Sequence, residues 1–312
     1  DFQWNTLSAD MYGFAKPDRY SNLLSVATLV DLGRFKAQAS GLATFIHDRL
    51  RGQQSPADKH VFTPAIYASF SPLRRSRGLQ LRAFVKRSFR MPTFNDLYYA
   101  DMGNSRLSPE RVTQYNVGIV YAHDSRGFVR SLRLSADAYY NLVKNKIVAY
   151  PKGQQFRWTM LNLGKVDIRG IDITALAGFN PVGDLYATIR GQYTYQRAID
   201  ITNPADNYYR HQIPYIPHHS GSAVLNLSWR KWNVNYSFIY VGARYNQQEN
   251  IRYNYTQPWY TSDVSLSRDF TFNKVRCRAL VEVNNLLSQD YDVILNYPMP
   301  KRNFRISLTV EI

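Results

Sequence analysis

The sequence is poor in cysteine and lacks long apolar runs, and each absence excludes a class of structure. Cys277 is the only cysteine among 312 residues, so an internal disulfide is excluded. No uninterrupted apolar stretch of about 18 residues occurs, which excludes a conventional transmembrane helix. No signal peptide is recognisable at Asp1, so we expect a mature or internal piece of a protein.

Acidic residues are also scarce relative to basic ones. The chain has 39 lysine and arginine residues against 23 aspartate and glutamate residues, which gives a formal net charge of +16. The cations are spread over predicted turns, loops and polar strand faces, without a basic helix or an RNA-binding module. We therefore expect no nucleic-acid partner. Basic loops and a basic lumen instead fit lipopolysaccharide or another anionic ligand.

What the chain has in abundance is an alternation of apolar and polar residues. In 303–312 every second residue is apolar, and the same rhythm occurs in 132–138, 223–230 and 275–284, where Cys277 falls on the apolar face. Since successive side chains of a strand point to opposite faces, these segments are strands with one apolar and one polar side. Long strands of this kind separated by turns are typical of an outer-membrane β-barrel.

The bulk composition agrees with a membrane barrel. The mean hydropathy of −0.40 fits strands of which one face meets water. Aromatic residues make up 14% of the chain, with 24 tyrosines, and tyrosine and tryptophan favour the membrane–water interface. A large soluble β-protein is the alternative, but such proteins rarely have strands this long.

Short and long connections alternate along the sequence, as in barrels with short periplasmic turns and long extracellular loops. Thirteen strands are predicted, and 1–8 is a candidate fourteenth that would place both termini on the periplasmic side. Predicted strands begin near Ser21, Ala37, His60, Gly78, Arg111, Val129, Ile168, Leu185, His218, Asn233, Trp259, Val275 and Asn303. Short turns are expected near 32–35, 71–78, 123–127, 180–184, 230–233 and 271–274, and long loops near 51–59, 91–108, 151–166, 198–217, 244–258 and 288–302.

Three segments resemble the TonB-dependent receptor family of Gram-negative outer membranes. The segments 88–93 and 103–110 resemble that family's paired FRAP and NPNL boxes, 162–172 resembles its N-x-G…G-x-E/D strand, and 284–291 with 298–304 resembles its closing segment. The matching box residues are Phe89, Arg90, Pro92, Asn104, Leu107, Pro109 and Glu110.

The sequence departs from the family pattern at several of these positions. Met91 replaces the usual alanine, Ser105 and Arg106 replace proline and asparagine, and Leu287 stands where phenylalanine is common. Ile312 stands at the end in place of an aromatic residue. The order and spacing of the three segments still resemble the family from about residue 78 onward.

The resemblance implies an all-β fold, a transmembrane antiparallel β-barrel of about 22 strands. We expect residues 1–312 to be its C-terminal 13–14 strands, without the N-terminal plug domain. The resemblance also implies an outer-membrane importer of a scarce large ligand, energised by the TonB–ExbB–ExbD system through that plug. It implies no enzymatic activity, no cofactor and no resident metal. Lipopolysaccharide is an expected neighbour, and a surface lipoprotein lid occurs in some branches of the family.

Aromatic and arginine residues gather in three predicted extracellular loops, where they suit a large and partly planar ligand. The alternative is that these rings pack the loops together or form the aromatic girdle of the barrel. The candidate ligand-binding residues are Tyr98, Tyr99, Arg106, Tyr208, Tyr209, Arg210, Arg252, Tyr253 and Tyr255.

The overall character from residue 88 onward resembles the vitamin B12 receptor branch, which favours a corrinoid, with an iron–siderophore as the alternative. Haem receptors of the family usually place a histidine between the two boxes, and none occurs between Arg90 and Pro109. His211, His218 and His219 remain candidates for binding iron. Outside the family, a passive 14-stranded channel and a structural barrel serving as an adhesin stay open as hypotheses.

Overall fold

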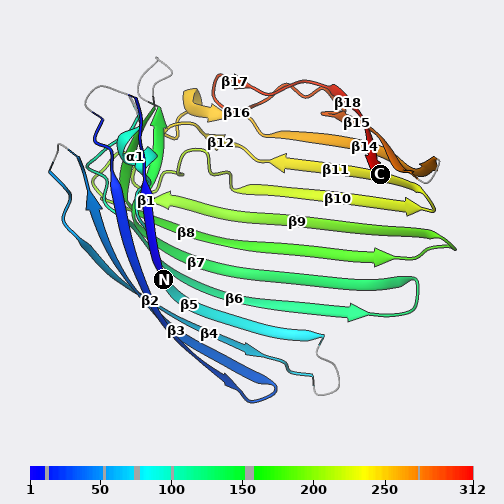
Figure 1. The fold of residues 1–312 in the computed structure, drawn as a ribbon, viewed down its shortest axis with the longest axis horizontal. Coiled ribbons are helices and arrows are strands. Elements are labelled where there is room, and N and C mark those ends of the chain that lie inside the picture. The colour runs from blue at the N-terminus through cyan, green and yellow to red at the C-terminus, as the bar shows by residue number, and fades with distance from the viewer. Residues whose placement is uncertain are drawn as a thin grey trace.

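The computed structural model describes residues 1–10, 14–51, 54–73, 78–99, 102–151, 158–272 and 275–311. One antiparallel sheet of 14 strands contains most of the chain, and it bends into the curved wall shown in Figure 1. Its strands, in order, are β1 (Phe2–Thr6), β2 (Asp18–Asp31), β3 (Phe35–Arg49), β4 (Lys59–Phe70), β5 (Leu79–Arg90), β6 (Glu110–Asp124), β7 (Val129–Pro151), β8 (Trp158–Phe179), β9 (Leu185–Asp200), β10 (His219–Trp229), β11 (Trp232–Val241), β14 (Trp259–Phe272), β15 (Val275–Asn284) and β18 (Asn303–Glu311).

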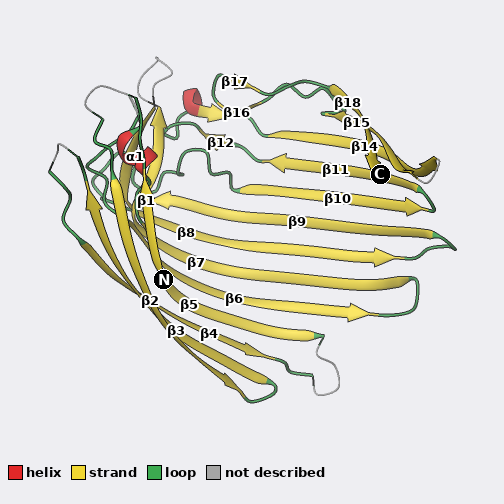
Figure 2. Ribbon diagram, viewed as in Figure 1, coloured by secondary structure: helices red, strands yellow, loops and turns green. Residues whose placement is uncertain are grey.

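Smaller elements lie in the connections at one end of the strands (Figure 2). They are α1 (Phe94–Tyr98), the 3-10 turn η1 (Arg252–Asn254), and the two short hairpins β12 (Arg244–Tyr245) with β13 (Tyr255–Thr256) and β16 (Asp292–Ile294) with β17 (Tyr297–Pro298). Among the described residues, no helix is long and apolar enough to cross a membrane. The predicted all-β fold is confirmed, and β1 is the candidate fourteenth strand.

The two faces of the sheet differ in polarity because the alternation stays in register from strand to strand. On the apolar face, Ala138 of β7 lies opposite Val117 of β6 and Ile171 of β8. The side chains of Val117 and Ile171 are nevertheless 60% and 44% exposed. Cys277 lies on this face as predicted, opposite Phe270 and Val310. An exposed apolar surface that runs across neighbouring strands fits contact with lipid.

The polar face carries charged side chains that pair across strands. Arg278 Nε donates to Asp269 Oδ1 at 2.6 Å, and Arg82 Nε donates to Asp137 Oδ1 at 3.0 Å. Thr194 on β9 donates to Asp172 on β8 at 2.7 Å. The face opposite the apolar one is therefore a wall of paired charges and hydrogen bonds, as the sequence alternation predicts for a lumen.

The ends of the strands differ as the sequence predicts. At one end the connections are tight, with Gly33 and Gly183 at positive φ of 75° and 51°, a conformation that glycine adopts without steric cost. At the other end lie α1 and the two short hairpins (Figure 1). Positions 74–77 and 273–274, which fall in two of the predicted turns, lie outside the described residues.

The predicted long loop at 151–166 is wrong at 158–166, which lie in β8, whereas 152–157 lie outside the described residues. Strand β7 continues to Pro151, and β8 begins at Trp158 rather than near Ile168, so the two strands pair as far as Pro151 opposite Trp158. The polar residues of this stretch do not end the strands, because the hairpin keeps its backbone hydrogen bonds through mutual pairing. Its side chains Ile147 and Leu163 are buried under neighbouring loops.

Two small apolar cores lie at this long-loop end. The first joins strand residues Val143, Val166, Ile168 and Ala198 to Ile213 of the 201–218 connection. The second is formed by Leu97, Leu107 and Ile147. In both cores, residues of long connections pack against the ends of β7, β8 or β9.

Candidate functional site

The long-loop end of the sheet holds all nine predicted ligand-binding residues, in three loops. The 91–109 loop begins with α1, which is capped by Thr93: its hydroxyl accepts from Asp96 N at 3.1 Å, while Thr93 N donates to the Asp96 carboxylate at 2.9 Å. Since the two groups satisfy each other, this capping box fixes the start of the helix.

A buried ion pair from the sheet holds this loop in place. Arg19 donates to both carboxylate oxygens of Asp48 at 2.7 and 2.8 Å, and also to the Pro92 carbonyl at 2.8 Å. The Arg19 guanidinium lies over the Phe94 ring, 5.1 Å from its centre. The loop is therefore attached to β2 and β3 through one arginine.

The seven residues of the paired boxes lie in this loop and at the ends of the two strands that flank it. Asn104 donates to the Met160 carbonyl at 2.9 Å, and Leu107 belongs to the second apolar core. The buried Glu110 accepts from the backbone amide of Ile147 at 3.0 Å. Pro92 is buried, Pro109 accepts from Asn145, Arg90 lies 3.6 Å from Asp96, and Phe89 lies in β5 opposite Arg111. The boxes thus connect β5, the loop and the β7–β8 hairpin.

The first group of predicted ligand-binding residues lies on this loop in different environments. Tyr98 is half-buried against Phe94, with ring centres 6.2 Å apart. Burial and the nearby Asp48 carboxylate raise the pKa of Tyr98. Tyr99 is 57% exposed and Arg106 is also exposed, so these two side chains are free to meet a ligand.

The second and third groups lie on connections that interlock. The Tyr208 hydroxyl donates to Glu249 Oε1 at 3.2 Å, and the Glu249 charge raises the pKa of Tyr208. Asn250 donates to the Gln212 carbonyl at 3.2 Å, and His211 Nδ1 lies 3.1 Å from the Gln248 carbonyl. Among the described residues no hydrogen bond or ion pair joins the first group to either of these.

The rest of the second and third groups divides by exposure. Tyr209 is half-buried, whereas Arg210 is exposed and has a positive φ of 65°. Arg252 is exposed, Tyr253 is 87% exposed and Tyr255 is 41% exposed. The structure thus assigns Tyr208 to holding the loops together and leaves the side chains of the third group open to solvent.

A groove of about 380 Å³ runs beside the third group, between the 244–258 and 285–302 connections. Tyr253 and Tyr255 line it together with three residues that the sequence prediction missed, Asn246, Trp259 and Tyr291. The rings of Trp259 and Tyr291 stack with centres 4.4 Å apart. Tyr291 was recognised in the sequence as part of the closing segment, but nothing in the sequence places it beside Trp259.

Two polar atoms in the wall of this groove lack hydrogen-bond partners in the described part of the chain. Asn246 Oδ1 is a buried acceptor and Trp259 Nε1 is a buried donor. Buried polar atoms are rarely left unpaired in folded proteins, so a molecule that reaches either atom gains a hydrogen bond there. The groove therefore offers aromatic faces, with one buried donor and one buried acceptor on residues that line it.

Arg244 joins the two connections that form the walls of the groove. It is buried, and its Nη2 donates to the carbonyls of Asp292 and Val293 at 2.9 and 3.1 Å. Burial lowers the pKa of Arg244. This side chain connects the β12–β13 hairpin to the β16–β17 hairpin, which forms the other wall.

The candidate histidines have different partners, although the rings of His218 and His219 both lie near the Tyr195 ring, with centres 6.5 and 5.2 Å from it. His211 contacts Gln248, whereas His219 Nδ1 lies 2.8 Å from the Tyr193 hydroxyl on the apolar face of the sheet. No group of three or more histidine, cysteine, aspartate or glutamate residues suited to a metal ion occurs in the described ranges.

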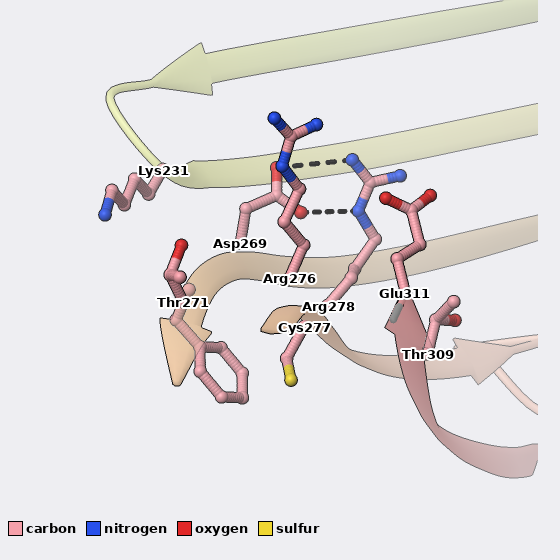
Figure 3. Close-up of a pocket in the computed structure, with 9 residues that line it drawn as sticks. Lys231, Asp269, Thr271, Arg276, Cys277, Arg278, Thr309 and Glu311 are labelled. Atoms are coloured by element: carbon pink, nitrogen blue, oxygen red, sulfur yellow. Dashed lines mark hydrogen bonds and ion pairs between the residues drawn. The ribbon is translucent and has the colours of Figure 1, made fainter. Parts of the chain in front are cut away.

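A polar pocket of about 390 Å³ lies at the opposite, short-turn end, on the lumen side of β14, β15 and β18 (Figure 3). The Asp269–Arg278 pair occupies its centre, with Lys231, Arg276 and Glu311 around it. Because its central charges are already paired, we interpret this pocket as part of the sheet's polar wall.

The family model described as TonB dependent receptor-like, beta-barrel matches residues 12–286. The chain belongs to the TonB-dependent receptor family. Similar proteins include the vitamin B12 transporter BtuB of Photobacterium profundum, 27% identical over 237 residues, which is 74% of this chain and 35% of that protein. The vitamin B12 transporter BtuB of Vibrio vulnificus is 36% identical over 88 residues, 28% of this chain and 13% of that protein.

Solved structures of the family share the fold. The copper transporter OprC superposes with a TM-score of 0.70 at 14% identity, over 94% of this chain and 49% of that one. The ferric citrate transporter FecA gives 0.69 at 13% identity, over 95% and 45%, and the ferric-catecholate import receptor Fiu of E. coli K12 gives 0.67 at 14%, over 94% and 45%. This chain thus spans less than half the length of these proteins.

Proposed function

We propose that residues 1–312 form part of the barrel of an outer-membrane receptor that imports a corrinoid of the cobalamin class. The observation that carries this proposal is the aromatic groove at the long-loop end, with its unpaired Asn246 acceptor and Trp259 donor. The similarity to two vitamin B12 transporters supports it from an independent direction.

The chemistry of a corrinoid matches that of the groove. Its macrocycle is large and nearly planar, so it can lie against the exposed faces of Tyr253 and Tyr255. Its rim carries amide groups that both donate and accept, which suits Trp259 Nε1 and Asn246 Oδ1. We assign Tyr99, Arg106, Arg210 and Arg252 to further contacts, because their side chains are exposed on the same end of the sheet.

The proposed partners follow from the family. The polar face of the sheet lines the lumen, and transport is energised by TonB–ExbB–ExbD acting through a plug domain. The apolar face lies in the outer membrane of a Gram-negative bacterium, in contact with lipopolysaccharide, and a surface lipoprotein lid is a candidate additional partner. The receptor moves its ligand without covalent chemistry, in keeping with relatives that are named as transporters.

The test is binding by the full-length receptor purified in detergent, followed by uptake in cells. Cyanocobalamin, a ferric catecholate, ferric citrate and haem are titrated separately, with quenching of tryptophan fluorescence as the readout because Trp259 lines the groove. We expect saturable binding of cyanocobalamin alone, and uptake that disappears in cells without TonB.

Other outcomes identify the alternatives. Saturable binding of an iron chelate or of haem, without binding of cyanocobalamin, overturns the corrinoid proposal and identifies that molecule as the ligand. Absence of any saturable binding, together with steady ion conductance in a planar bilayer, overturns the proposal of a receptor and supports a passive channel.

A further inference from the structure

Two neighbouring strands of the wall, β10 and β11, carry no aspartate, glutamate, lysine or arginine at any position of 219–229 or 232–241. They pair with each other and lie between β9 and β14 (Figure 1). Both flanking strands have charged residues, among them Arg190 on β9 and Asp269 on β14. In a chain with a formal net charge of +16, these two adjacent strands form a distinct uncharged region.

The lumen-facing residues of β10 and β11 are here called the neutral strip. Asn226 of β10 lies opposite Thr188 of β9 and Asn235 of β11 in the strand register. Thr188 shares a face with Thr194, whose hydroxyl donates to Asp172 on the lumen wall, because the two threonines are spaced by an even number along β9. The hydroxyl and amide side chains of the strip include Ser222, Asn226, Ser228, Asn233, Asn235 and Ser237.

Most side-chain hydrogen bonds of the strip join neutral groups. Asn226 Nδ2 donates to Thr188 Oγ1 at 3.2 Å, and Asn235 donates to Asn226 Oδ1. The Ser228 hydroxyl donates to Asn233 at 2.8 Å. Asn226 is also exposed. Neutral hydrogen bonds at an exposed surface have a small net free energy, so a passing molecule with its own amides can exchange with them at little cost.

The neutral strip begins beside the aromatic groove. Val241, at the long-loop end of β11, lies opposite Trp259, which is the first residue of β14 and lines the groove. Asn246, which also lines the groove, lies on the connection that leaves β11. The other end of the strip is the tight turn between Trp229 and Trp232 at the short-turn end. A ligand that leaves the groove along this part of the wall therefore moves over the strip.

The strip differs in charge from the strands on either side of it. Arg190 of β9 lies opposite Val224, and Asp263 of β14 lies opposite Ser237 and accepts a hydrogen bond from its hydroxyl at 3.4 Å. Passage through a membrane protein needs contacts that are favourable enough to enter and weak enough to leave. A corrinoid such as cyanocobalamin has no net charge and carries amides on its rim. Its chemistry therefore matches the strip better than it matches the charged flanks.

We propose that the neutral strip is the part of the lumen wall along which the corrinoid moves from the groove toward the periplasm. The rim amides of the corrinoid exchange hydrogen bonds with Asn226, Asn235 and the serines of the strip. This inference rests on the proposed function, because it takes the corrinoid as the cargo. It adds a second selective step after surface binding, in which the wall favours cargo without net charge.

The test compares binding with uptake for the full-length receptor carrying Asn226→Asp, which adds one negative charge at nearly constant volume. The probes are cyanocobalamin and its monocarboxylic acid, in which one rim amide is a carboxylate. The matched control is Asn141→Asp, on the lumen face of β7 four residues from Asp137.

We expect both variants to bind both probes as wild type does in detergent. In cells, Asn226→Asp should slow TonB-dependent uptake of cyanocobalamin about tenfold, because the carboxylate has to lose water as the ligand passes. Uptake of the monocarboxylic acid, relative to wild type, should be slowed further by repulsion between like charges. Asn141→Asp should follow wild type with both probes.

Three results overturn the proposal. These are unchanged uptake in Asn226→Asp, equal slowing in Asn141→Asp, and equal slowing of both probes in Asn226→Asp, which would assign this face to contact with the plug domain. Asn235→Asp, with the same result expected, takes the place of Asn226→Asp if that variant does not reach the outer membrane. A wild type that neither binds nor imports cyanocobalamin overturns the proposed function as well, whereas wild-type import without the expected difference between variants overturns the strip alone.

Discussion

Arg19 and Asp48 face each other across β2 and β3 in a two-point ion pair at the base of the 91–109 loop. Their side chains are only 10% and 8% exposed. Arg19 also reaches the Pro92 carbonyl and lies over Phe94. One guanidinium thus joins two strands to the loop that carries Tyr98 and Tyr99.

Replacing Asp48 by asparagine should destabilise the protein substantially. A buried arginine left without its carboxylate costs about 3 kcal/mol, and the 91–109 loop should become sensitive to protease. The measurement is thermal unfolding in detergent together with limited proteolysis. The control is Asp31→Asn, which breaks the exposed pair with Lys36 and should cost less than about 1 kcal/mol. Equal losses in the two variants would contradict the structural role of Arg19.

Tyr253→Ala should weaken ligand binding without affecting stability. The side chain is 87% exposed and lines the groove, so its removal takes away a ring face but no packing within the protein. A lost aromatic contact of about 1 kcal/mol corresponds to roughly fivefold weaker cyanocobalamin binding. Tyr208→Phe is the matched comparison, because it removes only the hydroxyl that contacts Glu249. If Tyr208→Phe weakens binding as much as Tyr253→Ala, the groove is not the binding surface.

The strands could be predicted because their information is local. The alternation in 132–138 and 275–284 predicts which residues lie on the apolar face, including Cys277. The turn residues around Gly183 likewise predict a turn there. The start of β8, residues 158–166, was missed, because the strand extends there past its pairing with β9 and the polar residues look like a loop.

The candidate site could be predicted only in part, because its contacts join distant residues. Composition identified the loops rich in tyrosine and arginine, but it did not separate Tyr208, which holds two loops together, from Tyr253, which is free. Nor does any pattern pair Arg19 with Asp48, or place Trp259 against Tyr291. Such contacts depend on which loop folds over which strand, and a single sequence does not record that.

Arg244→Met should release the β16–β17 hairpin while leaving the sheet intact. The methionine fills much of the same volume but cannot donate to the carbonyls of Asp292 and Val293. Hydrogen bonds from a charged donor contribute about 1.5–3 kcal/mol each, so local stability should fall by at least about 3 kcal/mol. Hydrogen exchange of 290–298 should rise, and cyanocobalamin binding should weaken. Arg252→Met, an exposed arginine of the same connection, should leave this exchange unchanged; unchanged exchange in Arg244→Met would contradict the supporting role.

His218 should make the long-loop end sensitive to acid. Burial, with smaller contributions from His219 and Arg197, lowers the pKa of His218 from its ordinary value of 6.5, and its Nε2 has no hydrogen-bond partner in the described part of the chain. The unfolded chain therefore binds a proton at this histidine more readily than the folded chain does. The folded state is thus most stable above pH 6.5, and this stability is lost as the pH falls from 6.5 through the lowered pKa of His218. We expect the melting temperature of wild type to drop below pH 6.5 more steeply than that of His218→Gln, with the exposed His123→Gln as the control that follows wild type. Parallel curves for wild type and His218→Gln would show that acid acts elsewhere, since this imidazole is the group whose protonation the burial opposes.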